Sequence, residues 1–138
     1  MKKILTILII ALVSISPIFA QNNSTKKADK LFDRLEFVKA AEEYLKLADK
    51  SPDNYIMERL ADSYYNIFNT REAEKWYSKI INDEPNAEII FRYSEMLKAN
   101  GKYKESNIWM SKFSEIKPYD TRAIAFRNTP NYIDKIIK

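Results

Sequence analysis

Apolar residues recur along most of this chain at spacings of three and four, the period of an amphipathic α-helix. Near the start, one stripe predicts a helix over residues 26–35 and a second predicts a helix over residues 38–49. The first stripe is Ala28, Leu31, Phe32 and Leu35, and the second is Ala41, Tyr44, Leu45 and Ala48. Ser51-Pro52-Asp53-Asn54 follows. Because proline cannot continue a helix and Asp or Asn caps one, this segment predicts a helix end and a new helix start.

The pattern returns with a period of 33 residues, marked by Pro52, Pro85 and Pro118. Similar residues precede each proline at the same offsets: Ala28, Ala61 and Ser94; Leu31, Tyr64 and Leu97; Ala40, Ala73 and Ser106; Tyr44, Tyr77 and Met110; Leu47, Ile80 and Phe113. Such a period is typical of a solenoid of helical hairpins. We therefore predict an all-α domain over residues 26–127. It has seven helices, with three hairpins at about 22–52, 55–85 and 88–118 and a capping helix at 120–127.

The repeat alignment also predicts which residues are buried. Close helix crossing should bury Ala40, Ala61 and Ala73 almost fully, and Gly101 should supply a left-handed helix end. The two tryptophans, Trp76 and Trp109, share one repeat position, where we favour packing between hairpins over an exposed binding platform. Four tyrosines are also expected in the core: Tyr44, Tyr64, Tyr77 and Tyr103. The predicted stripe of the last hairpin is Ser106, Ile108, Trp109, Met110 and Phe113.

Both ends of the chain differ from the repeats. Lys2, Lys3 and the apolar run at 4–15, followed by Ala20, predict a secretory signal over residues 1–20, with an uncleaved anchor as the alternative. Residues 21–25 form a polar leader. In the tail at 128–138, Ile133, Ile136 and Ile137 form one short stripe. The tail either docks on the third hairpin or cap, or meets a further domain or partner, and we favour the second.

Composition excludes several classes of function. The net charge of +4 falls to +2 without Lys2 and Lys3, which argues against a nucleic-acid binder that neutralises phosphates. The chain contains no histidine and no cysteine, so a Cys–His nucleophile and a histidine base are impossible. One glycine cannot build a glycine-rich phosphate loop. We predict that the protein is not an enzyme and has no cofactor or metal.

Over residues 22–118, the offsets resemble the tetratricopeptide repeat family: small residues at close crossings, large neighbours and a closing proline. The chain departs from the family in its period, since about 34 residues are usual. It also lacks the early tryptophan and has Ser94 at one crossing. The resemblance implies an inner groove, lined by the first helix of each hairpin, that binds a protein or peptide. Transferred to this sequence, the groove residues are Asp29, Phe32, Asp33, Tyr55, Glu58, Asp62, Tyr65, Asn66, Glu88, Phe91, Glu95 and Lys98.

This implied groove holds six carboxylates and one lysine, interleaved with four aromatic residues. It would suit an extended segment that carries lysine or arginine with apolar residues between them. The alternative is a solvated face that binds nothing. Of the family's clamp for a C-terminal carboxylate, only Arg92 has a counterpart, so a chaperone-tail binder is not expected. Lys26, Arg59 and Arg92 recur one position beyond the groove as a basic ridge.

A second resemblance concerns Lys117-Pro118-x-Asp120-x-Arg122-Ala123-x-Ala125-Phe126 and Pro130-Asn131-Tyr132, together with the lysine-rich leader. These residues look like the opening of Bacteroidota envelope proteins in which the repeats precede a WD40-like propeller and an OmpA-like domain. That family is associated with type IX secretion. The resemblance implies an exported scaffold in the periplasm or at the outer membrane, with no membrane span in the mature chain. A structural spacer and an export chaperone remain alternatives, and the oligomeric state stays open.

Overall fold

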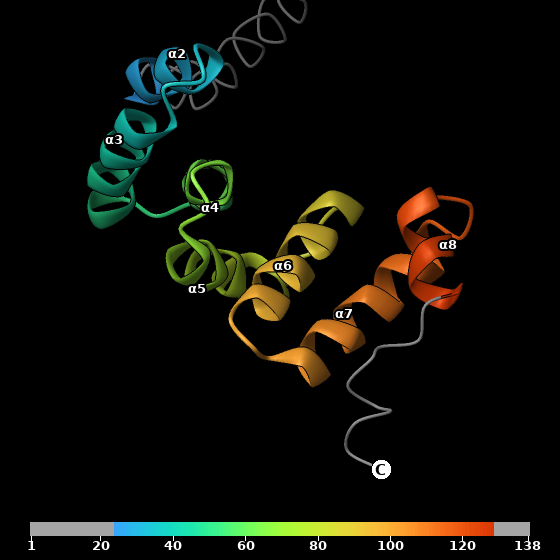
Figure 1. Ribbon diagram of the computed structural model, residues 1–138. Helices are drawn as coiled ribbons and strands as arrows, with labels where there is room; N and C mark the ends of the chain where they lie inside the picture. The colour runs from blue at the N-terminus through green and yellow to red at the C-terminus, as the bar shows by residue number, and fades with distance from the viewer. Residues whose placement is uncertain (1–23, 129–138) are drawn as a thin grey trace, which may run out of the picture.

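The computed structural model describes residues 24–128, and this part of the chain is all-helical with no strand (Figure 1). Its seven helices match the predicted number and class. They are α2 (Lys26–Asp33), α3 (Phe37–Lys50), α4 (Asn54–Asn66), α5 (Thr70–Ile80), α6 (Ala87–Ala99), α7 (Tyr103–Ile116) and α8 (Thr121–Asn128). The signal predicted at 1–20 lies outside the described residues. So do most of the polar leader and the tail isoleucines Ile133, Ile136 and Ile137.

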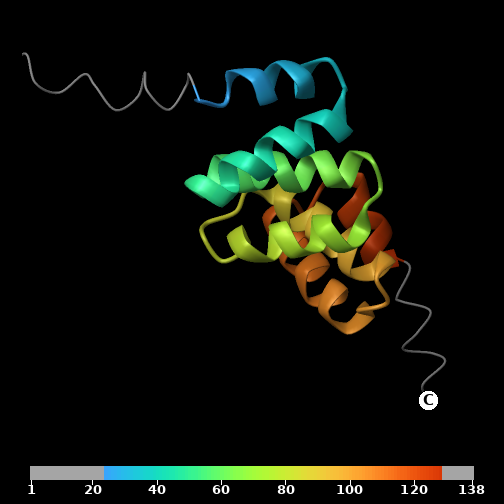
Figure 2. The ribbon, with the colours of Figure 1, turned by 90° about the vertical axis from the view of Figure 1, so that its left-hand side faces the viewer.

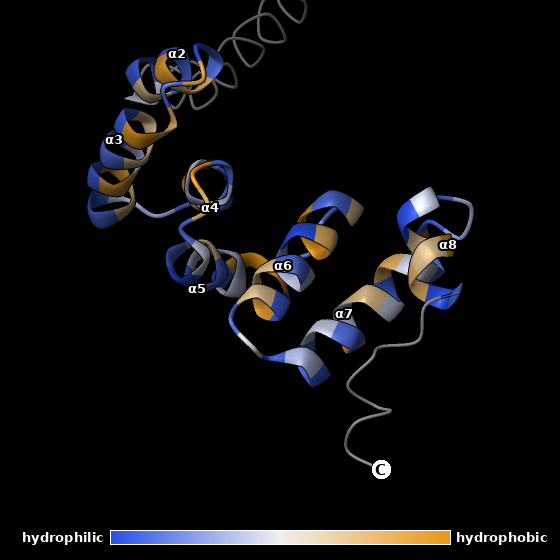
Figure 3. Ribbon diagram, viewed as in Figure 1, coloured by the Kyte–Doolittle hydropathy of each residue, from blue (hydrophilic) through white to orange (hydrophobic). Residues whose placement is uncertain are grey.

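Each helix packs against the next one along the chain, and α4 also contacts α6. The helices therefore succeed one another across the molecule, with α2 at one end and α8 at the other (Figure 1). In the view turned by 90°, α2 lies at the top and α8 lies behind the nearer helices (Figure 2). Both apolar and polar stretches are visible on the helices (Figure 3). The apolar side of each helix meets its neighbours, as expected of short helices that depend on tertiary packing.

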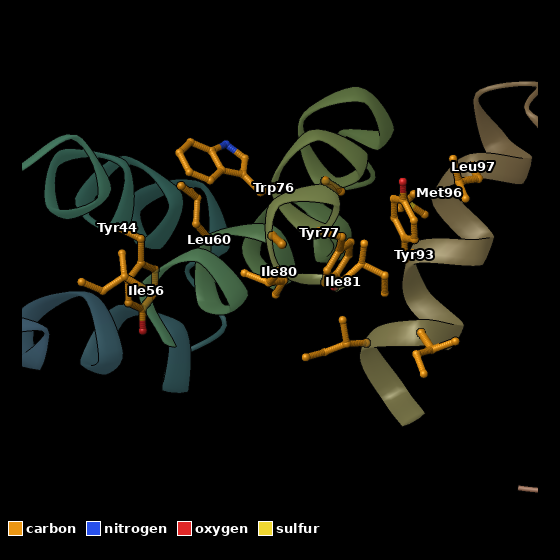
Figure 4. Close-up of a cluster of buried hydrophobic side chains, with 14 of the residues drawn as sticks. Tyr44, Ile56, Leu60, Trp76, Tyr77, Ile80, Ile81, Tyr93, Met96 and Leu97 are labelled. Atoms are coloured by element: carbon orange, nitrogen blue, oxygen red, sulfur yellow. The ribbon is translucent and has the colours of Figure 1, made fainter. Parts of the chain in front are cut away.

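The core runs through the stack of helices and uses the repeat positions predicted to be buried. Ala40, Ala61 and Ala73 have no exposed surface, which confirms the close crossings. Tyr44 and Tyr77 are equally buried, and the cluster that contains them extends from Ala28 on α2 to Ala123 on α8. Figure 4 labels its members from α3 to α6. Trp76 is buried, and Trp109 is partly buried with its ring edge-on to Tyr93 of the same hairpin. Both tryptophans therefore contribute to packing, while the predicted packing between hairpins stays a prediction.

The turn inside each hairpin has the same backbone geometry in all three repeats. Leu35, Phe68 and Gly101 are 33 residues apart, and their φ angles are 61°, 57° and 81°. At each turn the amide of the left-handed residue donates three residues back, and the next amide donates five residues back. Those donors and acceptors are Leu35 to Phe32 and Glu36 to Leu31, Phe68 to Tyr65 and Asn69 to Tyr64, and Gly101 to Lys98 and Lys102 to Leu97. This is the Schellman helix end, so the left-handed role predicted for Gly101 is confirmed.

Turns between hairpins also repeat. Asp53 accepts a hydrogen bond from the amide of Ile56 at 2.8 Å, and Asn86 accepts one from the amide of Ile89 at 3.0 Å. These are N-caps one period apart, and the first confirms the helix start predicted after Pro52. Side-chain caps therefore mark the starts of α4 and α6, and Schellman turns mark the ends of α2, α4 and α6.

For three apolar residues, the prediction of burial in the core is wrong. Leu35 is 72% exposed because α2 ends at Asp33 and the left-handed turn directs this residue into solvent. Tyr103 opens α7 and is 40% exposed. Ile108 is 56% exposed because it is only two residues from Met110 and Ser106, and helical side chains at that spacing face different directions.

Candidate functional site

The twelve predicted groove residues all lie on the first helices of the hairpins, α2, α4 and α6. The structure joins these helices through carboxylates one period apart. Asp29 on α2 accepts a hydrogen bond from the Tyr55 hydroxyl of α4 at 2.7 Å. Asp62 on α4 pairs with Arg92 of α6 at 2.8 Å, and Glu95 on α6 accepts from the Tyr65 hydroxyl of α4 at 2.5 Å. Because each carboxylate touches the adjacent first helix, the three lie along one continuous face.

Asp62 is the most buried member of this face, with 6% of its surface exposed. Besides Arg92, its Oδ1 accepts a hydrogen bond from the Tyr77 hydroxyl at 2.5 Å. Burial raises the pKa of Tyr77 far above its ordinary value, and the Asp62 charge adds to the effect. Burial alone would lower the pKa of Arg92, but Asp62 outweighs it and the pKa rises. Tyr77 therefore stays a donor and Arg92 stays a cation over the ordinary pH range.

The same arrangement recurs one repeat earlier around Asp29. The Tyr44 hydroxyl donates to Asp29 at 2.5 Å and the Thr25 hydroxyl donates at 2.7 Å. Burial acts to raise the pKa of Asp29, but hydrogen bonds from Tyr44, Thr25 and Tyr55 outweigh it and hold that pKa below its usual range. The Arg59 guanidinium of α4 lies 4.4 Å from the centre of the Phe32 ring, a cation–π contact with the previous hairpin.

The third repeat departs from this scheme because Met110 stands where a tyrosine is found before. Ser94 has its hydroxyl 3.7 Å from the Met110 sulfur instead. The cation comes from the capping helix, where Arg122 bonds Glu88 at 2.9 Å and lies 4.2 Å from the centre of the Phe91 ring. An arginine from the following hairpin or cap thus covers an aromatic residue of the preceding one at every junction.

The contacts that these arginines make with the preceding hairpin were not predicted from the sequence. Arg59 and Arg92 were expected as a basic ridge beside the groove, whereas they reach back over the preceding hairpin. The face is therefore less acidic than six carboxylates and one lysine would make it, and Asp62 is a buried partner of Arg92 rather than an open groove residue. One signal was present: Asp29 and Asp62 are each followed by an arginine 30 residues later and a tyrosine 15 residues later.

The remaining groove residues are more open. Asp33, Asn66 and Lys98 are exposed at the ends of α2, α4 and α6. Glu58 is half-buried, and desolvation together with the nearby Asp62 charge raises the pKa of its carboxyl. Phe32 and Phe91 are partly buried against the core and add less surface to the face than expected.

A hollow of about 480 Å³ opens where α4 and α6 end. Four of the twelve predicted residues line it, together with three that were not predicted. The full lining is Tyr65, Asn66, Phe68, Glu95, Met96, Lys98 and Ala99. This hollow has enough room to receive a side chain from another molecule.

Other observations bear on the site. Arg92, the one residue of the carboxylate clamp with a counterpart here, is engaged by Asp62 and Glu88. Within residues 24–128, no three or more acidic side chains gather in a group that could hold a metal ion. Over that same range no helix combines the length and apolarity needed to cross a bilayer.

No protein-family model matches the chain, and no curated protein resembles it closely enough to count as a relative.

Proposed function

We propose that this chain is an exported protein-interaction scaffold of the bacterial cell envelope. In this proposal the helices form a tetratricopeptide-type solenoid, and the face of α2, α4 and α6 binds an extended segment of a partner protein. The observation that carries it is the hollow at the ends of α4 and α6, because Tyr65, Asn66, Glu95 and Lys98 line it. The same proposal makes the chain the amino-terminal module of an OmpA-like, secretion-associated protein.

The charges on the face define the chemistry of the partner. Arg59, Arg92 and Arg122 offset much of the negative charge of Asp29, Asp62 and Glu88. Asp33, Glu58 and Glu95 remain, and Lys98 opposes them. A partner segment with lysine or arginine is therefore attracted moderately, and apolar contacts must supply the rest of the affinity.

A structural spacer is the second candidate, and the internal ion pairs favour it. Asp62, Arg92, Glu88 and Arg122 form a continuous chain of contacts from α4 through α6 to α8. Such a network fixes the hairpins relative to one another without any ligand. In this alternative the face is empty, and the protein holds a neighbouring domain at a set distance.

A displayed random peptide library separates the two candidates. The scaffold should enrich sequences with lysine or arginine, and a synthetic peptide made from them should bind more weakly as salt rises, because exposed charges are screened over about 8–10 Å. Recovery of no enriched sequence would favour the spacer. Asp62 is unsuitable as a test position because it is buried, so the informative variant is Asp33→Asn with Glu95→Gln.

The glutamine in that variant keeps an acceptor for the Tyr65 hydroxyl, so the local structure should survive. We expect about a fivefold to tenfold loss of affinity, the size of one weak charge contact. Asp49→Asn with Glu115→Gln removes the same charge from exposed positions on α3 and α7 and should change nothing. Equal losses in both pairs would indicate a nonspecific charge effect and count against the groove.

Export is tested separately. Fractionation of the native bacterium should place the protein in the periplasm or with the outer membrane, and amino-terminal sequencing should begin at Gln21. A chain that retains Met1 in the cytoplasm would contradict the envelope part of the proposal while leaving the peptide-binding part open.

A further inference from the structure

Phe68 is an unusual residue for its position. It occupies the left-handed region at φ 57°, where an L-residue other than Asn or Gly is strained, and 72% of its surface is exposed. Gly101 holds the same repeat position in the third hairpin, so this turn forms without any apolar side chain. Leu35 has the same conformation and exposure in the first turn, so the feature that distinguishes Phe68 is its place in the lining of the hollow.

Phe68 stands at the rim of the hollow described above, with Tyr65 and Met96 also in the lining. Tyr65 is held firmly, since its hydroxyl bonds Glu95 and its ring lies 5.2 Å from the Arg92 guanidinium. The Tyr77 ring packs edge-on against it at 6.5 Å. The hollow therefore has one fixed aromatic wall and one exposed aromatic rim.

The polar groups of the hollow determine which charge is favoured next to an apolar side chain bound there. Glu95 uses one carboxylate oxygen for Tyr65, and a carboxylate can accept several further donors. The carbonyl ends of α4 and α6 meet at this edge and favour a positive charge. Lys98 lines the same hollow and opposes that preference.

We propose that this hollow is an anchor subsite for one apolar or aromatic side chain of the bound segment, with an adjacent lysine or arginine of that segment on Glu95. This inference rests on the proposed function, because it names which partner residues the face selects. The guest packs between Tyr65 and Phe68, over Met96 and Ala99. Buried aromatic or aliphatic anchors of this kind often carry most of the affinity of an interface.

The chain supplies a matched pair of variants for the test. Phe68→Gly gives the second turn the residue that the third turn already has, so the fold should be retained. Leu35→Gly makes the same backbone change in the first turn, where the residue is equally exposed but does not line the hollow. Thermal unfolding and circular dichroism check that both variants fold.

The probe is a blocked synthetic peptide with a central tryptophan between two lysines, compared with a peptide in which alanine replaces the tryptophan. With the full chain we expect at least tenfold weaker binding of the alanine peptide. Phe68→Gly should bind both peptides equally weakly, and Leu35→Gly should behave as the unaltered chain does. Lys98→Ala should strengthen binding of the tryptophan peptide about twofold to fivefold.

The failures are distinguishable. If the lysine peptides bind, but neither Phe68→Gly nor replacement of the tryptophan by alanine weakens binding, the anchor subsite is refuted. The proposal that the face binds basic peptides is then retained. If neither peptide binds and the displayed library enriches no sequence, the proposed function itself is overturned and the subsite with it. If Leu35→Gly weakens binding as much as Phe68→Gly, the effect comes from turn geometry and the subsite is refuted.

Discussion

The buried carboxylate of Asp62 accepts a hydrogen bond from Tyr77 of its own hairpin and forms an ion pair with Arg92 of the next hairpin. Burying a charge is costly unless it is paired and hydrogen-bonded, and here both conditions are met. The contacts of Asp62 link α4 to α5 and to α6, so this one residue joins two hairpins. Its value lies less in net stability than in the penalty for removing either partner.

We expect Asp62→Ala to lower the free energy of unfolding by about 3 kcal/mol, because it leaves Arg92 and Tyr77 without their shared acceptor. Chemical denaturation measures the change. Asp33→Ala removes an exposed carboxylate from the same face and should cost little. Similar small losses in both variants would mean that the Asp62 cluster contributes nothing beyond surface charge.

Replacing Glu58 should raise stability, whereas replacing Asp62 should lower it. Desolvation and the Asp62 charge raise the pKa of its carboxyl, so the folded state holds the Glu58 proton more tightly than the unfolded state does. The ionised form is therefore destabilising, and this cost appears as pH rises through the unfolded pKa toward the folded one. We expect Glu58→Gln to raise the melting temperature at pH 7, with a gain that disappears at acid pH. A gain independent of pH would contradict this explanation.

At the scale of elements, the Schellman turns define the hairpins more sharply than the apolar stripes do. Gly101 is the one turn residue that the left-handed conformation favours, and a Cβ built on it meets no atom within 4 Å. The position is therefore restricted by backbone conformation alone and not by space. That separation makes the cost of a side chain there directly measurable.

We expect Gly101→Ala to destabilise the chain by about 1 kcal/mol, the usual cost of a left-handed L-residue. Thermal unfolding followed by circular dichroism measures it. The control is Ala99→Gly, two residues earlier at the exposed end of α6. Stabilisation by Gly101→Ala would show that the turn tolerates an L-residue without strain.

The close crossing of α4 yields a second expectation at this scale. Ala61 has no exposed surface, so Ala61→Leu should cost about 1–3 kcal/mol through overpacking. Ala125→Leu places the same side chain on an exposed position of α8 and should be nearly neutral. Denaturant midpoints compare the two, and an unchanged midpoint for Ala61→Leu would contradict the repeat alignment.

The sequence predicted the helices well because their apolar stripes and capping residues are local signals that repeat three times. It did not predict the left-handed backbone conformation of Leu35 and Phe68, because among the three turn residues only glycine is a residue type that favours this conformation. The resemblance to the tetratricopeptide repeat family, and not the apolar pattern, predicted that Asp29, Asp62 and Glu95 share one face. The pairing of Arg92 with Asp62 was missed because it depends on how α4 and α6 rotate against each other, which no single-helix pattern contains.

Across the whole molecule, the capping helix completes the junction network. Ala123 is fully buried, and Arg122 bonds both Glu88 and Asp120. Hydrogen bonds from Arg122 lower the pKa of Asp120 to about 2. Asp29 at the other end of the structure also has a lowered pKa. Both ends therefore carry carboxylates whose ionised form stabilises the fold.

We expect stability to fall as pH decreases from about 4 toward about 2. A carboxyl with a lowered folded pKa gives its full contribution above the unfolded pKa and loses it as the folded pKa is passed. Melting temperatures between pH 7 and pH 2 test this. Asp120→Asn should be less stable at neutral pH and show a shallower acid decline. An identical acid decline in that variant would remove Asp120 from the explanation.

The backward reach of the arginines has a consequence for the order in which the chain takes shape. Arg59 and Arg92 each lie 30 residues after the carboxylate they neutralise. A chain that emerges amino end first, from a ribosome or through a translocation channel, presents Asp29 and then Asp62 before the matching cation has appeared. Each hairpin therefore stays incompletely neutralised until the first helix of its successor is released. Assembly should then advance one hairpin behind emergence, with the last completed junction waiting for Arg122.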